Sequence, residues 1–234
     1  SEKIAYLPSY QVNDSTQSPP DIIFTRQDLG LPEEGFVFCC FNNTYKITPT
    51  SFDSWGRILE KVEGSVLLIY ADNDTAQINL TKEVALRGID PSRLIFGKRL
   101  PKPEYLARYR VADLFLDTHP YNAGTTSSDA LRMGLPVLTC IGNSFASRMG
   151  ASILHAINLP ELITTTQEEY ESLAIELAIN PEKLKIIKDK LVNNLPTAPL
   201  YDTPLFTRHL ESAYLTMYDR YQQGLDPDHI YVKH

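Results

Sequence analysis

Short apolar runs alternate with stretches of helical periodicity along most of the chain. Five runs are rich in β-forming residues and lack polar alternation: FVFCCF (36–41), SVLLIY (65–70), RLIF (93–96), DLFLD (113–117) and PVLTC (136–140). Such runs are typical of strands that are covered on both faces. Stretches with helical spacing separate them, at about 50–62, 75–88, 102–109 and 126–133. This alternation predicts right-handed βαβ units and a Rossmann-like α/β fold with a doubly wound parallel sheet.

After Thr139 the pattern predicts mainly helices, at 144–157, 166–179, 181–194 and 203–224. Pro181 and Pro204 suit the first turns of two of them, and Gly224 suits a C-terminal stop. The last helix carries aromatic side chains at helical spacing: Phe206, Tyr214, Tyr218 and Tyr221. We expect them to pack against this domain or another, and stacking on a ligand is the alternative.

Residues 1–30, which include QSPPDI, show few periodic signals and are interpreted as a linker or the end of a preceding segment. The chain starts at Ser1 without a charged region and an apolar core, so the sequence predicts no signal peptide, although an upstream segment could have been removed. No apolar run approaches the length that spans a membrane.

Composition narrows the class of partners. The 234 residues include 43% hydrophobic residues, enough for a sizeable core, and the formal net charge is -7. That charge argues against broad binding to nucleic acid or to an anionic membrane, while a local basic pocket remains compatible with it. Cys39, Cys40 and Cys140 lie in apolar runs, where cysteine behaves as a small hydrophobe, and a reducing cytoplasm is the simplest interpretation.

The stretch DTHPYNAGTTSSDALRMGLPVLT (117–139) places polar residues where a strand ends and a helix begins. Open α/β sheets bind ligands at this end of their strands. Gly124 permits close approach of the backbone, and the amides near Thr125 and Thr126 would open a helix that attracts a phosphate. Asp129, one turn later, could accept hydrogen bonds from ribose hydroxyls. An ordinary helix start, capped by Thr125 or Thr126, is the alternative.

Two other strand ends add positive charge to the same edge. FNNTYK places Asn43 and Lys46 after the first strand, and RLPKPEYLAR places Lys102 after the third. Together with a helix N-terminus, the two lysines could neutralise a diphosphate without a metal and stabilise a departing nucleotide. Either lysine alone would also fit a solvated surface.

Other candidate chemistry is weaker. In YADND, Asp72 and Asp74 could hold a divalent cation, but Asp74 also precedes Thr75 where a helix start needs a cap. His119 could line the site or shuttle a proton, and simple packing is the alternative. The sequence contains no G-x-S-x-G elbow, no P-loop and no Cys/His set with metal-ligand spacing, so hydrolase and zinc chemistry have little support.

With these pieces in place, the chain resembles the O-linked N-acetylglucosaminyltransferase and SPINDLY family, glycosyltransferase family 41, in its bacterial branch. The resemblance keeps its order from about residue 34 to 224. It rests on these blocks: FCCFNNTYKITPTSFDSWGRIL, RGIDPSRLIFGKRLPKPEYLAR, ADLFLDTHPYNAGTTSSDALRMGLPVLT, SFASRMGASIL, LPELI, EEYESLA and PLFTRHLESAYLTMYDRYQQG.

The resemblance implies the GT-B fold, in which two Rossmann-like lobes face each other and the second holds most of the nucleotide sugar. It divides the chain into a linker from an N-terminal lobe (1–30), a nucleotide-sugar-binding lobe (31–200) and a C-terminal helix and tail (201–234). Family members carry the other lobe and tetratricopeptide (TPR) repeats upstream, and both are expected partners of this lobe.

Site residues carry over by position. Lys46 resembles the lysine that contacts the donor diphosphate and is the candidate catalytic residue, and Asn43 stands where animal enzymes have glutamine. Lys102 resembles a lysine at the nucleotide, and Tyr105 replaces a histidine beside the uridine. We also assign Leu100 and His119 to the donor site.

The segment 117–129, where a strand ends and a helix begins, contains the remaining site residues that the resemblance implies. Thr125 and Thr126 resemble the threonines at the phosphates, and Asp129 resembles the aspartate at the ribose. Gly124 replaces a histidine of the animal pattern, so one contact is lost or supplied differently.

The implied reaction is inverting, metal-independent transfer of N-acetylglucosamine from UDP-N-acetylglucosamine to a Ser or Thr hydroxyl of a protein. No cofactor is expected, and the partners are a nucleotide sugar and a protein acceptor. The alternatives are transfer of glucose from UDP-glucose to Asn, transfer of fucose from GDP-fucose to Ser or Thr, and a non-catalytic nucleotide-binding or scaffold module.

Overall fold

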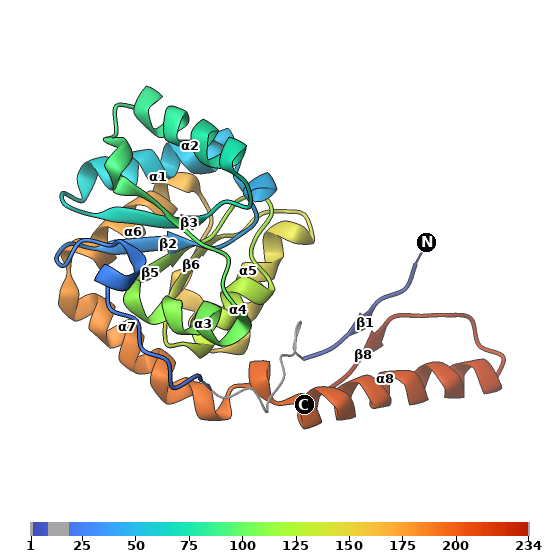
Figure 1. Cartoon of the computed structure of the whole chain (residues 1–234). Coiled ribbons are helices and arrows are strands. Elements are labelled where there is room, and N and C mark those ends of the chain that lie inside the picture. The colour runs from blue at the N-terminus through green and yellow to red at the C-terminus, as the bar shows by residue number, and fades with distance from the viewer. Residues whose placement is uncertain (1, 9–18, 234) are drawn as a thin grey trace.

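The computed structural model describes residues 2–8 and 19–233, and a six-stranded parallel sheet lies at its centre (Figure 1). The strand order is β4-β3-β2-β5-β6-β7. The strands are β2 (Val37–Cys40), β3 (Val66–Tyr70), β4 (Leu94–Gly97), β5 (Leu114–Leu116), β6 (Val137–Cys140) and β7 (Ile163–Thr164). Every neighbouring pair is parallel, which confirms the predicted fold class.

Helices cover both faces of this sheet, with α1, α2 and α6 on one face and α3, α4 and α5 on the other (Figure 1). Their bounds are α1 (Pro49–Lys61), α2 (Asp74–Leu86), α3 (Lys102–Ala107), α4 (Thr125–Arg132), α5 (Met149–Ala156), α6 (Gln167–Ile179), α7 (Pro181–Asn194) and α8 (Thr203–Gln222). The strands are buried between these layers, as their unbroken apolar runs predict: β2 and β6 are buried along their whole length.

The α1 helix shows how local sequence sets the structure. The Thr48 hydroxyl accepts a hydrogen bond from the Ser51 amide and caps the helix, and Pro49 occupies its first turn. Apolar residues at helical spacing, among them Phe52, Trp55 and Ile58, form the buried face.

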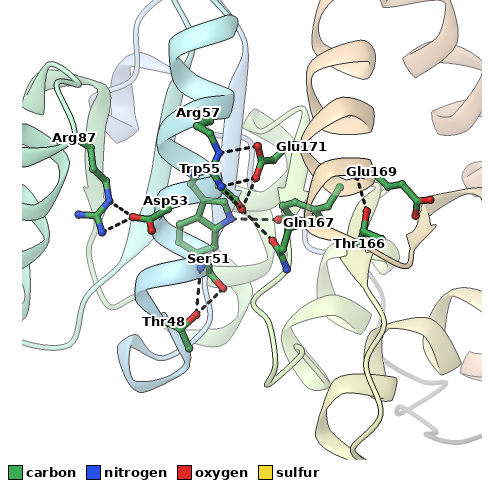
Figure 2. A network of polar contacts seen from close by, with 12 residues as sticks. Thr48, Ser51, Asp53, Trp55, Arg57, Arg87, Thr166, Gln167, Glu169 and Glu171 are labelled. Atoms are coloured by element: carbon green, nitrogen blue, oxygen red, sulfur yellow. Dashed lines mark hydrogen bonds and ion pairs between the residues drawn. The ribbon is translucent and has the colours of Figure 1, made fainter.

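Polar contacts fix α1 to its neighbours, as Figure 2 shows. The Arg57 guanidinium pairs with the Glu171 carboxylate of α6 at 2.7 Å, and Asp53 pairs with Arg87 at 2.6 Å. The Trp55 indole donates to the Tyr170 hydroxyl at 3.2 Å in the buried layer between the two helices. The α1–α6 layer therefore forms a fixed support behind the central strands.

The C-terminal part of the chain extends away from this body (Figure 1). Strand β1 (Ala5–Tyr6) pairs in parallel with β8 (Ile230–Tyr231), and α8 lies beside them. Tyr214, Tyr218 and Tyr221 of α8 are exposed. These three rings therefore lie outside the buried core of the described residues, whereas Phe206 is half-buried, and packing of the exposed rings against another domain stays a prediction.

Two local differences from the sequence prediction have physical causes. The helix expected over 144–157 begins only at Met149, because Ser144 and Ser147 bond to each other's backbone amides and form a turn. The strands β1, β7 and β8 have two residues each, too few to give a periodic signal.

The predicted linker lies partly outside the described residues, at position 1 and positions 9–18. Beyond that gap it follows the body: Arg26 pairs with Asp113 at 3.1 Å, and Arg110 donates to the Pro20 carbonyl at 2.9 Å. The three-part division of the chain stays a prediction. Among the described residues no helix combines the length and the apolar character needed to cross a membrane.

Candidate functional site at the switch point of the sheet

The loops after β2 and β5 border the point where the chain changes direction across the sheet. From β2 the chain builds outward to β3 and β4, and from β5, on the other side of β2, it builds outward to β6 and β7. The two loops therefore leave their strands in opposite directions at the carboxyl edge, which is where open α/β sheets bind ligands. The predicted site residues that follow β2 and β5 meet there.

A buried carboxylate organises the loop after β5. Asp117 is 3% exposed, and its Oδ1 accepts hydrogen bonds from the amides of Thr118 (2.8 Å) and Ala123 (2.7 Å). Its Oδ2 accepts from the Thr139 hydroxyl at 2.7 Å. Burial raises the pKa of Asp117 to about 7, against the opposing effect of these hydrogen bonds. The loop 117–123 is thus folded around one side chain.

The helix α4 begins directly after this loop with no side-chain cap. Gly124 occupies the cap position, and no side chain accepts a hydrogen bond there. The interpretation of Thr125 or Thr126 as the cap is therefore wrong. Thr125 is exposed, while the Thr126 hydroxyl donates to the Asn42 Oδ1 at 2.5 Å. An uncapped N-terminus keeps donors and a positive dipole end available for an anion.

Lys46 reaches from the β2 loop to the β5 loop. Its Nζ donates to the Asn122 carbonyl at 3.0 Å and lies 3.9 Å from the centre of the Tyr121 ring. The side chain is half-buried beside the start of α4. Asn43, in contrast, is exposed and precedes the short helical turn that contains Lys46.

Lys102 and Asp129 are paired with each other. The Lys102 Nζ lies 2.7 Å from the Asp129 Oδ2, and it lies 5.0 Å from the centre of the Tyr105 ring. Asp129 is 4% exposed, whereas Lys102 is exposed. The structure thus brings both lysines to the segment 117–129: Lys46 contacts the loop before α4, and Lys102 contacts a residue inside the helix.

A buried arginine lies beside this pair. The Arg108 guanidinium stacks on the rings of Phe41 (3.8 Å) and Tyr105 (4.8 Å), and it donates to the Lys98 carbonyl. Burial lowers the pKa of Arg108, and within the described residues its Nε has no hydrogen-bond partner. Arg108 and Leu100 line a hollow of about 410 Å³ at the end of β4.

Two tyrosines connect this hollow to the start of α4. The hydroxyl groups of Tyr105 and Tyr109 lie 2.5 Å apart, and the Tyr109 hydroxyl donates to the Thr126 carbonyl at 3.3 Å. Burial raises the pKa of both phenols, so both remain neutral donors.

His119 also belongs to the loop after β5, and its ring lies near the end of β6. Its ring Nδ1 is 3.3 Å from the Cys140 carbonyl, and its own carbonyl accepts from the hydroxyls of Thr48 and Ser51. The ring lines a second hollow, next to Gly142 and Thr166, that shares no lining residue with the one at Arg108. His119 is thus packed in the β5 loop and also reaches a surface hollow.

The acidic loop after β3 has another geometry. Asp72 is exposed and accepts from Thr44 (3.3 Å) and Asn73 (3.1 Å). Asn73 caps α2 by accepting from the Ala76 amide, so the expected cap at Asp74 is wrong by one residue. Over residues 2–8 and 19–233, no group of three His, Cys, Asp or Glu residues is arranged to hold a metal ion.

Three residues of the site were not among the sequence candidates: Asn42, Arg108 and, as an organising residue, Asp117. Asn42 is buried, donates to the Thr118 hydroxyl at 2.8 Å and accepts from Thr126. The signal for Asn42 was its place directly after an apolar run, one residue before the candidate Asn43. For Arg108 no local signal distinguishes it from the neighbouring Arg110.

Comparison with known proteins places the chain in a family. The model of glycosyl transferase family 41 matches residues 7–210. The chain is 35% identical over 213 residues to the UDP-N-acetylglucosamine–peptide N-acetylglucosaminyltransferase of Caenorhabditis elegans, covering 91% of this chain and 18% of that protein. It is 34% identical over 239 residues to the SEC protein of Arabidopsis thaliana, covering 99% of this chain and 24% of that protein.

A solved structure supports the same assignment. An O-GlcNAc transferase mutant from Thermobaculum terrenum superimposes with a TM-score of 0.77 at 31% identity, covering 92% of this chain and 40% of that one. The chain thus spans about a quarter or less of the curated relatives named above. Its fold is that of one lobe of a GT-B glycosyltransferase, and the chain belongs to glycosyltransferase family 41.

Proposed function

We propose that this chain is the nucleotide-sugar-binding lobe of an inverting protein glycosyltransferase that transfers N-acetylglucosamine from UDP-N-acetylglucosamine to Ser or Thr. One observation carries the proposal. Lys46 and Lys102 both contact the segment 117–129, and α4 begins within that segment without a side-chain cap. Two cations and a free helix N-terminus are what a diphosphate needs for binding.

Each residue then has a role in the proposed site. The Lys46 ammonium and the amides at Thr125 and Thr126 bind the diphosphate, and Lys46 stabilises the charge that develops as it departs. The Asp129 carboxylate, held at 2.7 Å by Lys102, accepts from the ribose hydroxyls. The uracil occupies the hollow that Arg108 and Leu100 line, and the Tyr105 ring stacks against the Arg108 guanidinium.

Cations replace a metal in this proposal. The Lys46 ammonium and the N-terminus of α4 supply the positive charge that a divalent ion supplies in metal-dependent transferases, while Lys102 pairs with Asp129. The Asp72/Asp74 loop is exposed and engaged in capping contacts around Asn73. We therefore expect donor binding to be independent of magnesium.

The first test is isothermal titration of the chain with UDP, in EDTA and in magnesium. Equal binding in both conditions is the expected result. Binding only with magnesium would move the site to the Asp72/Asp74 loop, and absence of binding would favour a scaffold module. Activity of the intact gene product with UDP-N-acetylglucosamine, UDP-glucose and GDP-fucose then distinguishes the three donor alternatives.

We also propose the setting of the enzyme. The proton acceptor and much of the acceptor groove come from an upstream lobe, with TPR repeats that select protein acceptors. The relatives are several times longer than this chain, which supports such additional domains. Cys39, Cys40 and Cys140 are buried free thiols, which agrees with a reducing, cytoplasmic setting.

A further inference from the structure

We infer that Asp117 is the positioning residue of the diphosphate site: its hydrogen bonds hold the β5 loop in the one arrangement that brings Lys46 to the start of α4. This inference rests on the proposed function, because it names what assembles the same site. Asp117 itself is buried and lies behind the loop, so it acts through other residues.

The contacts of the carboxylate define how it acts. Oδ1 accepts from three nitrogen donors: the amides of Thr118 and Ala123 and the side-chain nitrogen of Asn42, at 2.8, 2.7 and 3.3 Å. The first two close the loop on itself, and the third ties it to the end of β2. Oδ2 has a separate partner, the Thr139 hydroxyl of β6 at 2.7 Å. One side chain therefore links three strand ends.

The two proposed diphosphate ligands depend on these links. The carbonyl that receives Lys46 belongs to Asn122, the residue before Ala123. The hydroxyl of Thr126, in the first turn of α4, donates to Asn42, whose nitrogen points to Asp117. Loss of the carboxylate would release both Lys46 and the helix start, although neither touches Asp117 directly in this chain of contacts.

The surroundings leave the carboxylate no room to move. A Cβ atom added at Gly150 of α5 would lie 2.7 Å from the Asp117 Oδ2 and 2.4 Å from the Thr139 hydroxyl. Such separations are shorter than real contacts, so any larger residue at position 150 must displace the pair. The backbone of Asp117 is held as well, because its carbonyl accepts from the Tyr170 hydroxyl at 3.0 Å and that hydroxyl accepts from the Trp55 indole.

The substitution Asp117→Asn should preserve this arrangement of hydrogen bonds while it removes the charge. It therefore separates a positioning role from an electrostatic role. Its oxygen can accept from the three nitrogen donors, and its nitrogen can donate to the Thr139 hydroxyl, which also accepts. Alanine can replace neither set of contacts. If the role of Asp117 were purely electrostatic, Asp117→Asn and Asp117→Ala would weaken UDP binding equally.

The test measures UDP affinity by titration in wild type, Asp117→Asn, Asp117→Ala and Gly150→Ala. We expect Asp117→Asn within about threefold of wild type, and Asp117→Ala and Gly150→Ala weaker by at least about tenfold, because small displacements of positioned groups are costly. Gly56→Ala is the matched control, since its Cβ would meet only Arg87 side-chain atoms at 3.6 and 3.9 Å. Its affinity should remain within about twofold, as expected for a substitution away from the site.

Hydrogen exchange provides a second measurement that needs no ligand. The amides of Thr118 and Ala123 should exchange faster in Gly150→Ala and, where it folds, in Asp117→Ala, and should remain slow in Asp117→Asn. If wild type and Gly150→Ala bind UDP equally well, and the Thr118 and Ala123 amides exchange at the same rate in both, the positioning role of Asp117 alone is overturned. If wild type does not bind UDP, the proposed function is overturned instead. In that case, unchanged exchange of the Thr118 and Ala123 amides in Gly150→Ala would overturn the positioning role separately.

Discussion

Two aspartates follow two strands that flank β2 in the same parallel sheet, and they differ in nearly every physical respect. Asp117 follows β5, is 3% exposed and accepts four hydrogen bonds from three strand ends. Asp72 follows β3, is exposed and accepts from Thr44 and its neighbour Asn73. The local sequence patterns, an apolar run followed by Asp, are alike. What differs is whether neighbouring loops cover the carboxylate, and this decides whether it can organise a site.

The largest expected effect of this difference is on stability. Asp117→Ala leaves several buried donors unsatisfied, and each costs about 1 to 3 kcal/mol. We expect the free energy of unfolding to fall by about 3 kcal/mol or more, measured by urea denaturation. A loss below about 1 kcal/mol would show that water replaces the carboxylate without penalty.

The second effect concerns pH. Burial raises the pKa of Asp117 from the ordinary value of an aspartate to about 7, so folding favours its protonated form. Its contribution to stability is complete below the unfolded pKa and is lost as pH rises toward 7. We expect the free energy of unfolding of wild type, relative to Asp117→Asn, to decrease between about pH 4 and 7. Parallel pH profiles of the two proteins would contradict the raised pKa.

An intermediate effect is expected at Asp129, a second buried carboxylate that is placed to touch ligand. Asp129→Asn should weaken UDP binding by about 1 to 3 kcal/mol, because it removes a charged acceptor for the ribose hydroxyls. Asp53→Asn is the control, since Asp53 also pairs with a cation, Arg87, but lies outside the site. A lower melting temperature with unchanged UDP affinity would make Asp129 a structural residue only.

The smallest effect is expected at the exposed member of the pair. Asp72→Ala should change the free energy of unfolding by no more than about 0.5 kcal/mol, as is usual for exposed side chains away from such contacts. UDP affinity should be unchanged with or without magnesium. A loss of UDP affinity in Asp72→Ala that occurs only with magnesium would show that Asp72, and not only the loop around Asp117, belongs to the binding site.

The sequence predicts the fold more completely than the site because strands and helices leave local patterns. The five long strands lie where their apolar runs predict, and α7 has the predicted bounds, 181–194. The prediction fails where a local hydrogen bond competes with the pattern, as at Ser144 and Ser147, which delay the start of α5.

The sequence predicts only those site residues that directly follow a recognisable strand. Lys46 and Lys102 reach the predicted edge because both follow strands of one parallel sheet. The pairing of Lys102 with Asp129 and the burial of Arg108 depend on tertiary packing, which no spacing encodes. The helix α2 is capped by Asn73, so the prediction of a cap at Asp74 is wrong by one residue. Only the positions of the side chains distinguish these two neighbours.

Lys46 is the central ligand of the proposed diphosphate site, and the most direct test of that role is titration of Lys46→Ala with UDP in EDTA. Loss of a charged hydrogen bond should weaken binding by about 1.5 to 3 kcal/mol, without a comparable loss of folding stability. Lys61→Ala, at the end of α1 and exposed, is the matched control and should bind as wild type does. Equal UDP affinity in wild type and Lys46→Ala would contradict the assignment of the site.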